Sequence, residues 1–195
     1  MENLFFDLRR LKHLGRGAIV GKTVRIRRPE DVSIGDYTII DDFTYISSAA
    51  DIGSYCHIAP QVTIGGGSGH LKMGDFVGIG AGSAIYTASS DYFEVSLDLP
   101  SVPRRFQFGG TVGSVEFGDC VLLGVQTLVL PGVTLPQGVA GGAQSIFNKG
   151  EYEPWTLYDG NCPAPTLCRR VKRRGIQKAI AVMEQCRSEN DQSTT

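Results

Sequence analysis

Hydrophobic residues recur every six positions along most of this chain. From residue 34 it reads IGDYTI, IDDFTY, ISSAAD, IGSYCH, IAPQVT and IGGGSG, and an isoleucine opens each segment. A helix would repeat near every 3.6 residues and an ordinary strand every two. Six residues per side and three sides per turn predict a solenoid of short parallel strands, about 4.8 Å apart. The expected inward positions are Val20, Ile26, Ile34, Ile40, Ile46, Ile52, Ile58, Ile64, Met73, Ile79, Ile85, Phe117, Leu123, Val129, Leu135, Gly141 and Phe147.

The repeat is interrupted three times. Two extra residues precede Ile34, residues 70–72 precede Met73, and a long segment, 91–116, precedes Phe117. Counted by sides, all three interruptions fall at the same corner of a triangular prism. Because a long insertion inside a compact domain is usually functional, we expect the functional site along this corner.

Both ends of the solenoid are expected to carry caps, since a stack of coils otherwise exposes its core. Helical spacing occurs at Leu4, Phe5, Leu8 and Leu11, and again at Ile176, Ile180 and Met183. The predicted fold is therefore all-β, a parallel β-helix with an N-terminal helical cap and a C-terminal helix packed back on it. The predicted parts are the cap, 1–17, the β-helix with its loop insertion, 18–150, and an exit turn with the C-terminal helix, 151–195.

Composition describes an ordinary domain without a strong electrostatic field. The chain has 195 residues, 42% of them hydrophobic, and a formal net charge of −1, so neither nucleic acid nor a membrane is expected as a partner. The N-terminus lacks the apolar run of a signal peptide, and no stretch approaches the ~18 apolar residues of a membrane span. We therefore expect a cytoplasmic protein. The five cysteines have no C-x-x-C spacing and are expected to be isolated thiols, without disulfides or a structural zinc site.

Four segments resemble the hexapeptide-repeat acyltransferases. They are CHIAPQVTIGGG (56–67), AIYTASSDYFEVSLDLPSVP (84–103), VLLGVQTLVLPGVTLPQGVAGGAQSIF (121–147) and the W-x-x-Y-x-G-x-x-P exit (155–163). The likeness is strongest to enzymes that acylate nucleotide-linked amino sugars or O-acetylate sugars. It implies a left-handed β-helix, acetyl-CoA or another acyl-CoA as co-substrate, no metal, and a homotrimer that binds CoA between adjacent subunits.

The long loop favours an amine as the acyl acceptor. Residues 91–116 contain no histidine, and a neutral amine is nucleophilic without the strong base that a hydroxyl needs. The resemblance implies that Asp91 binds and orients the acceptor's ammonium group, with Ser90, Tyr92 and Arg104 as substrate contacts. Ser90 stands where relatives often carry another acid, which leaves Asp91 as the carboxylate of this motif. The alternative is that Asp91 is a solvated turn former.

Two histidines are candidate catalytic groups, and each has a structural alternative. His70 lies at the loop corner and would act as a base or substrate contact, or else be an exposed bulge residue. His57 precedes a different corner and would reach the loop of a neighbouring subunit, or else be a hydrogen-bonded structural residue. Cys120 replaces a histidine that is common in relatives, so we do not carry over the usual chemistry at that position.

A face of small residues in the last coils suits the pantetheine arm of CoA, because such a face exposes backbone amides. The residues predicted to bind CoA are Gly124, Gly142, Ala143 and Ser145 along this face, with Lys149 and Arg170 for the phosphates. The alternative is that the glycines serve only the corners and that the basic run 169–174 is a solvated helix face.

Four functions remain open at this point. The favoured one is an acyl-CoA-dependent N-acyltransferase that acts on a nucleotide-linked aminodeoxy sugar, such as dTDP-4-amino-4,6-dideoxyglucose or a 3-amino relative, for surface glycan synthesis. A sugar O-acetyltransferase would depend on His57 or His70. A zinc enzyme like the γ-carbonic anhydrases needs three clustered histidines, whereas this chain has three in all and His13 lies in the cap. The fourth is a non-catalytic β-helix scaffold.

Overall fold

The computed structural model of the chain describes residues 3–90, 92, 98–162 and 168–192. Face A of its solenoid consists of β1 (His13–Leu14), β4 (Val32–Ile34), β7 (Ala49–Ile52), β10 (His70–Met73), β15 (Val115–Phe117) and β18 (Thr134–Leu135). Face B consists of β2 (Ile19–Val20), β5 (Ile39–Ile40), β8 (His57–Ile58), β11 (Gly78–Ile79), β16 (Leu122–Leu123) and β19 (Ala140–Gly141). Face C consists of β3 (Arg25–Ile26), β6 (Tyr45–Ile46), β9 (Thr63–Gly65), β12 (Ala84–Tyr86), β17 (Leu128–Val129) and β20 (Ile146–Phe147).

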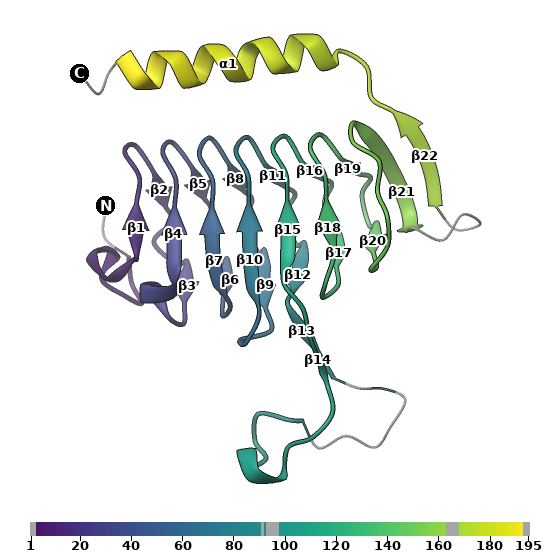
Figure 1. Cartoon of the computed structure of the whole chain (residues 1–195). Coiled ribbons are helices and arrows are strands. Elements are labelled where there is room, and N and C mark those ends of the chain that lie inside the picture. Colours follow the sequence, from purple (N-terminus) through teal and green to yellow (C-terminus); the bar gives the residue numbers. More distant parts are fainter. Residues whose placement is uncertain (1–2, 91, 93–97, 163–167, 193–195) are drawn as a thin grey trace.

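These faces form the predicted left-handed parallel β-helix, with the coils stacked side by side (Figure 1). Neighbouring strands pair in parallel and in register, so that Ile34 lies beside Ile52 on face A and Ile46 beside Ile64 on face C. The last coil is closed by β21 (Thr156–Cys162), which pairs with β19 at one end and with β20 at the other. Faces B and C are thereby joined into one sheet.

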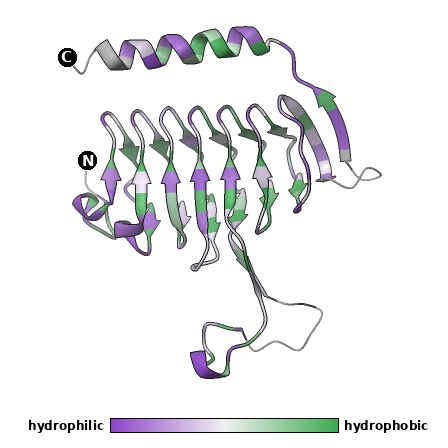
Figure 2. Ribbon diagram, viewed as in Figure 1, coloured by the Kyte–Doolittle hydropathy of each residue, from purple (hydrophilic) through white to green (hydrophobic). Residues whose placement is uncertain are grey.

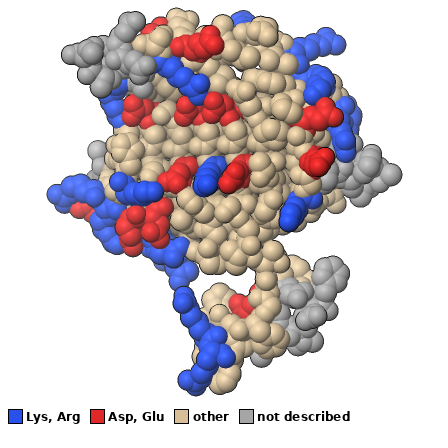
Figure 3. All heavy atoms as spheres, in the orientation of Figure 1, with Lys and Arg blue, Asp and Glu red and all other residues tan. Residues whose placement is uncertain are grey.

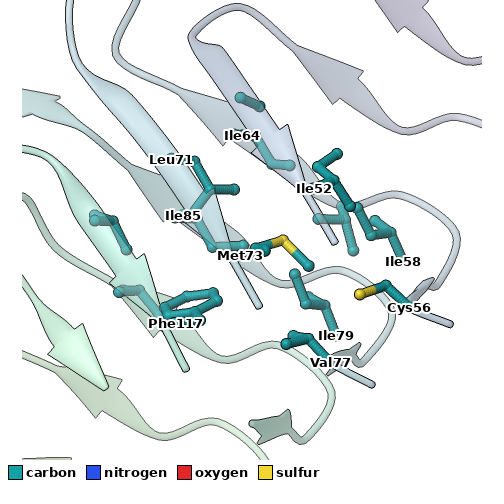
Figure 4. Packing of buried hydrophobic residues seen from close by; sticks show 14 of the residues in the cluster. Ile52, Cys56, Ile58, Ile64, Leu71, Met73, Val77, Ile79, Ile85 and Phe117 are labelled. Atoms are coloured by element: carbon teal, nitrogen blue, oxygen red, sulfur yellow. The ribbon is translucent and has the colours of Figure 1, made fainter. Parts of the chain in front are cut away.

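The first residue of each hexapeptide points into the prism, as the period predicted. Every inward position that the sequence indicated is buried, and Figure 4 shows part of the stack, with Ile52, Ile58 and Ile64 directed into one core. Burial of each aliphatic side chain contributes roughly 1.5–3 kcal/mol. The core also contains a second column, from the fifth position of each hexapeptide, whose members are Val24, Thr38, Thr44, Ala50, Cys56, Val62, Val77, Ser83, Val121, Thr127, Val133, Val139 and Ser145.

The corners turn at the fourth position of the hexapeptide, which has a left-handed backbone. Non-glycine residues with φ between 56° and 64° are Tyr37, Phe43, Tyr55, Gln61, Phe76, Cys120, Gln126 and Gln144. Glycines at the second position serve a different purpose. A Cβ on Gly124 would lie 2.7 Å from the backbone nitrogen of Ala143 in the next coil, so the close approach of coils requires glycine there.

The three interruptions of the repeat share the corner between faces C and A, hereafter the loop corner. They are the 3₁₀ turn η2 (Pro29–Asp31), the segment 66–69, and the long loop, in which β13 (Ala88–Ser89) pairs antiparallel with β14 (Thr111–Val112) around η3 (Arg104–Phe106). Figure 1 shows the long loop projecting away from the prism. The sequence prediction that these breaks lie along one edge is confirmed, but the second break is 66–69 and not 70–72, because residues 70–72 pair with β7 as part of β10.

The N-terminal cap differs from the prediction. Helical spacing indicated a helix within residues 2–14, but the structure has only the 3₁₀ turn η1 (Leu8–Arg10), which Asp7 caps by accepting a hydrogen bond from the Arg9 backbone. The chain cannot continue as a helix because His13–Leu14 already pairs with β4 as the first strand of face A. Leu11 is buried against the first coil, so the cap function itself is retained.

The C-terminal segment also differs from the prediction near residue 168. Cys168–Lys172 is a strand, β22, antiparallel to β21, so the basic run is not the helix face considered above. The helix α1 begins only at Ile176 and extends to Gln192. Cys162 is disulfide-bonded, which corrects the expectation that all cysteines are isolated thiols, whereas Cys56, Cys120 and Cys186 are free.

Helix α1 returns along the corner between faces A and B, hereafter the helix corner (Figure 1). Met183 is buried there, and most hydrophobic residues of α1 lie in its N-terminal half (Figure 2). Tyr55 stacks between Tyr37 and Phe76 in the coils beneath, and its hydroxyl donates a hydrogen bond to the Cys186 carbonyl. The predicted packing of the C-terminal helix on the solenoid is thus confirmed. No helix in the described part of the chain has the length and hydrophobicity needed to cross a membrane.

Candidate active site at the loop corner

A cleft of about 1130 Å³ lies at the loop corner, between the coils and the long loop. It is lined by Arg27, Arg28, Ser47, residues 66–68, 88–90 and 98, and most of 100–112. The first of these belong to successive coils, and the others form the base and inner side of the loop. The cleft therefore extends along the solenoid axis, with the coils on one side and the loop on the other. It lies at the corner where the interruptions of the repeat predicted a site.

Two of the predicted substrate contacts lie in this cleft. Ser90 follows β13 at the loop base, and Arg104 lies on η3 at the far wall. Tyr92 is exposed and does not line the cleft. Asp91 lies outside the described residues, so its role as the ammonium-binding carboxylate stays a prediction.

The cleft is rich in arginine at its N-terminal end. The Arg28 guanidinium donates a hydrogen bond to the Gly67 carbonyl and lies 3.1 Å from the Asp31 carboxylate. These contacts fix one wall of the cleft. Arg27 and Arg104 make no ion pair among the described residues. Figure 3 shows basic side chains continuing from the first coils down to the loop.

The sequence did not single out Arg27 and Arg28. The signal was present, because both residues follow the inward residue Ile26 and lie directly before the first interruption of the repeat. Counting sides places that interruption at the corner of the long loop. The same count would have placed these arginines at the corner from which the loop that carries Arg104 projects.

His70 opens β10 on face A and does not line the cleft. Its Nε2 lies 2.9 Å from the Asp51 carboxylate, which also accepts a hydrogen bond from Lys12 at 3.2 Å. Burial raises the pKa of Asp51, but the hydrogen bond with Lys12 and the charges of Lys12 and His70 outweigh it, so that the pKa is lowered overall. Asp51 is therefore a stable anion that orients the imidazole.

His57 lies on face B, away from the loop corner. Its Nε2 is 2.8 Å from Oδ2 of Asp41, and its side chain is 57% exposed. The carboxylate orients one ring nitrogen and leaves Nδ1 available. Neither His57 nor His70 is among the residues that line the cleft.

The residues predicted to bind CoA do not form one surface on this chain. Gly124, Gly142 and Ala143 stack at the corner between faces B and C. Ser145 is fully buried, and its hydroxyl accepts a hydrogen bond from the Gly160 backbone, so it is not part of an exposed face. A Cβ on Gly142 would lie 2.4 Å from Asp159, which supports the structural explanation for that glycine.

The two predicted phosphate-binding cations lie on different sides of the last coil. Lys149 is exposed beyond β20, at the end of face C. Arg170 is on β22, paired with Tyr158, and its guanidinium lies 5.8 Å from the centre of the Tyr158 ring. Their common role in binding CoA stays a prediction. Among the described residues, no group of three or more histidine, cysteine, aspartate and glutamate side chains could hold a metal ion.

Comparison with known proteins agrees with this geometry. Residues 31–66 match the bacterial transferase hexapeptide family. The chain is 32% identical to the dTDP-4-amino-4,6-dideoxy-D-glucose acyltransferase of Escherichia coli over 87% of its own length and 90% of the relative. AntD, an N-acyltransferase from Bacillus cereus solved with dTDP and 3-hydroxybutyryl-CoA, superposes with a TM-score of 0.82 and 28% identity, over 96% of this chain and 99% of AntD.

A variant of AntD, solved with dTDP-4-amino-4,6-dideoxyglucose and coenzyme A, superposes with a TM-score of 0.81, at 28% identity and over 96% of this chain and 100% of that one. The chain therefore belongs to the hexapeptide-repeat acyltransferase family. Within that family, its likeness over nearly the whole length is to acyltransferases of dTDP-linked amino sugars.

Proposed function

We propose that this protein transfers the acyl group of acyl-CoA, acetyl-CoA in the first instance, to the amino group of a nucleotide-linked aminodeoxy sugar. Candidate acceptors are dTDP-4-amino-4,6-dideoxyglucose and its 3-amino relatives. The observation that carries the proposal is the sequence likeness, over nearly the full length, to the dTDP-4-amino-4,6-dideoxy-D-glucose acyltransferase of Escherichia coli. The arginine-rich cleft under the loop supports it, because the cleft suits an anionic nucleotide sugar.

The reaction requires little acid–base chemistry from the protein. The neutral amine attacks the thioester carbonyl, the tetrahedral intermediate collapses, and the C–S bond breaks as the amide forms. The departing CoA thiolate accepts the proton that the amine nitrogen loses. Asp91 would hold the ammonium until it loses its first proton to solvent water and becomes the neutral amine, with Ser90, Tyr92 and Arg104 as contacts to the sugar nucleotide.

Assembly into a homotrimer is part of the proposal. One outward column of face B exposes three apolar side chains, Ile19 at 41%, Ile39 at 36% and Leu122 at 51% exposure, with His57 and Gly78 between Ile39 and Leu122. Such a column is typical of surfaces that pack against another subunit. CoA would then lie between subunits, against Gly124, Gly142 and Ala143, with Lys149 and Arg170 near its phosphates. We place the enzyme in the cytoplasm, in the synthesis of surface glycans.

A second candidate is O-acetylation of a sugar hydroxyl. The contact between His57 and Asp41 favours it, because a carboxylate-oriented imidazole is the base that a hydroxyl nucleophile needs. In a trimer, His57 of one subunit would have to reach the loop cleft of its neighbour. This candidate therefore predicts that His57 is essential.

The proposal is tested by measuring CoA release from acetyl-CoA with dTDP-4-amino-4,6-dideoxyglucose, its 3-amino isomer, and dTDP-glucose as the matched hydroxyl control. We expect release only with an amino sugar and a product with the mass of an amide. Release with dTDP-glucose alone would establish O-acetylation instead. If there is no turnover and calorimetry detects no CoA binding, the proposal is rejected and the hypothesis of a non-catalytic β-helix scaffold remains.

A further inference from the structure

The loop-corner cleft has opposite chemistry at its two ends. Its N-terminal end carries Arg27 and Arg28, and Arg104 lies on the loop. The loop base contains Ser90 and the acid Asp98, which lies beside Gly110. A nucleoside diphosphate sugar with a free amine has the same polarity, with a diphosphate anion at one end and an ammonium at the other.

The length of the cleft also fits such a ligand. Pairing of β3 with β6, of β6 with β9 and of β9 with β12 places Arg27 three coils from the loop base. At about 4.8 Å per coil, this separation is about 14 Å. A diphosphate bound by an extended arginine side chain leaves room for one hexose between the phosphates and Ser90.

The arginines differ in how much of their charge is free. Asp31 partly neutralises Arg28, whose guanidinium is also committed to the Gly67 carbonyl. Arg27 and Arg104 have no carboxylate partner among the described residues and approach from the coils and from the loop, respectively. They are therefore the charges that an anion in the cleft would meet.

We infer that the end of this cleft nearest the first coils is a diphosphate subsite, in which Arg27 and Arg104 bind the two phosphates from opposite walls. Arg28 holds the segment 66–68 in place through its hydrogen bond to the Gly67 carbonyl. The inference rests on the proposed function and gives the orientation of the nucleotide sugar in the cleft. The nucleotide lies over the first coils, and the sugar points toward the loop base. CoA also contains a diphosphate, but its predicted binding face lies in the last coils, at the other end of the solenoid.

The test uses calorimetric titration of dTDP, dTMP and CoA into the wild-type protein and two variants, Arg27→Gln and Arg104→Gln. Each variant has a matched control that removes a neighbouring charge outside the cleft, Arg25→Gln on β3 and Arg105→Gln on η3. We expect each cleft variant to bind dTDP about tenfold more weakly, because one charge-assisted hydrogen-bond donor is lost. The preference for dTDP over dTMP should shrink, while CoA affinity stays the same.

Kinetics provide a second measurement. The KM for the nucleotide sugar should rise in both cleft variants, with the KM for acyl-CoA unchanged and both controls like wild type. The inference is overturned if wild type and both variants bind dTDP equally, or if CoA affinity falls instead. Loss of dTDP affinity in the variants, together with a wild-type protein that acylates no amino sugar, would support the subsite and reject the proposed reaction.

Discussion

The Arg187 guanidinium lies 2.8 Å from Oδ2 of Asp119, although 68 residues separate them in the chain. The same guanidinium lies 2.7 Å from Oδ2 of Asp75, in the preceding coil. Both carboxylates are themselves fixed, because Oδ1 of Asp75 accepts from the Ser54 backbone and Oδ1 of Asp119 from the Asp75 backbone. One side chain of α1 thus binds two neighbouring coils.

Replacing Arg187 by glutamine should loosen α1 from the helix corner. The ion pairs are partly exposed, so the loss should be about 1 kcal/mol, which lowers the Tm of a chain of this size by roughly 2–4 °C. Thermal unfolding checks this, with Lys178→Gln on the same helix as the control. Equal Tm values for the two variants would show that the ion pairs do not hold the helix.

Removing either histidine should leave amine acylation intact. His57 and His70 are each bound to a carboxylate and lie outside the cleft lining, and an amine acceptor does not need them as bases. We expect kcat with an amino sugar within about tenfold of wild type for His57→Gln and His70→Gln, since general base catalysis contributes 10²–10⁴-fold where it operates. A loss of a hundredfold or more in one variant would assign that histidine a catalytic role.

Substituting alanine for Gly124 should destabilise the fold whether or not CoA binds there. The added Cβ would lie 2.7 Å from the Ala143 nitrogen, and overpacking of this kind costs about 1–3 kcal/mol. Gly67→Ala is a useful control, because its Cβ meets no atom within 4 Å and only its φ of +62° is unfavourable. Chemical denaturation should give a clearly larger loss for Gly124→Ala than for the control.

Stability should fall as the pH rises from about 9 toward 11. Burial raises the pKa of the Cys56 thiol from 9.0 to about 11, and its Sγ donates to the Gly74 carbonyl at 3.3 Å. The unfolded thiol ionises first, so the stabilisation is complete below pH 9 and is lost as the pH approaches 11. Two pKa units correspond to at most about 3 kcal/mol.

Thermal melts between pH 8 and 10 measure this effect. Burial raises the pKa of Tyr152 to about 12, so this residue changes the stability only above that pH range. Cys56→Ala should have a lower Tm at pH 8 but a shallower dependence on pH. The same slope in both proteins would contradict the assignment to Cys56.

The period of six predicted the core because each short strand directs one residue per repeat inward. Ile34, Ile40 and Ile46 are fully buried for that reason. The second inward column carried an equally regular signal, since valine, threonine, serine, cysteine or alanine occupies the fifth position, as Val62 and Thr127 do. These residues are smaller and partly polar, and a pattern based on hydrophobicity alone does not single them out.

The ends of the chain were predicted less well because tertiary contacts decide their structure. Helical spacing at the N-terminus is overridden when His13–Leu14 pairs with β4. Residues 168–172 form a strand because β21 presents a free edge to them. In the candidate site, Arg104 was anticipated from the loop motif, whereas Arg27 becomes significant only when coils distant in sequence are brought to one corner.

Contacts of α1 with particular coils set the length of this solenoid. Tyr55 meets Cys186, Asp75 and Asp119 meet Arg187, and Cys120 meets Met183. A duplicated or deleted coil would leave every hexapeptide pairing satisfied, since each coil contacts only its neighbours. It would nevertheless shift the later coils by one step against the helix and separate these partners. The contacts of the helix are thus compatible with only one number of coils, and they fix the distance between the cleft and the last coil.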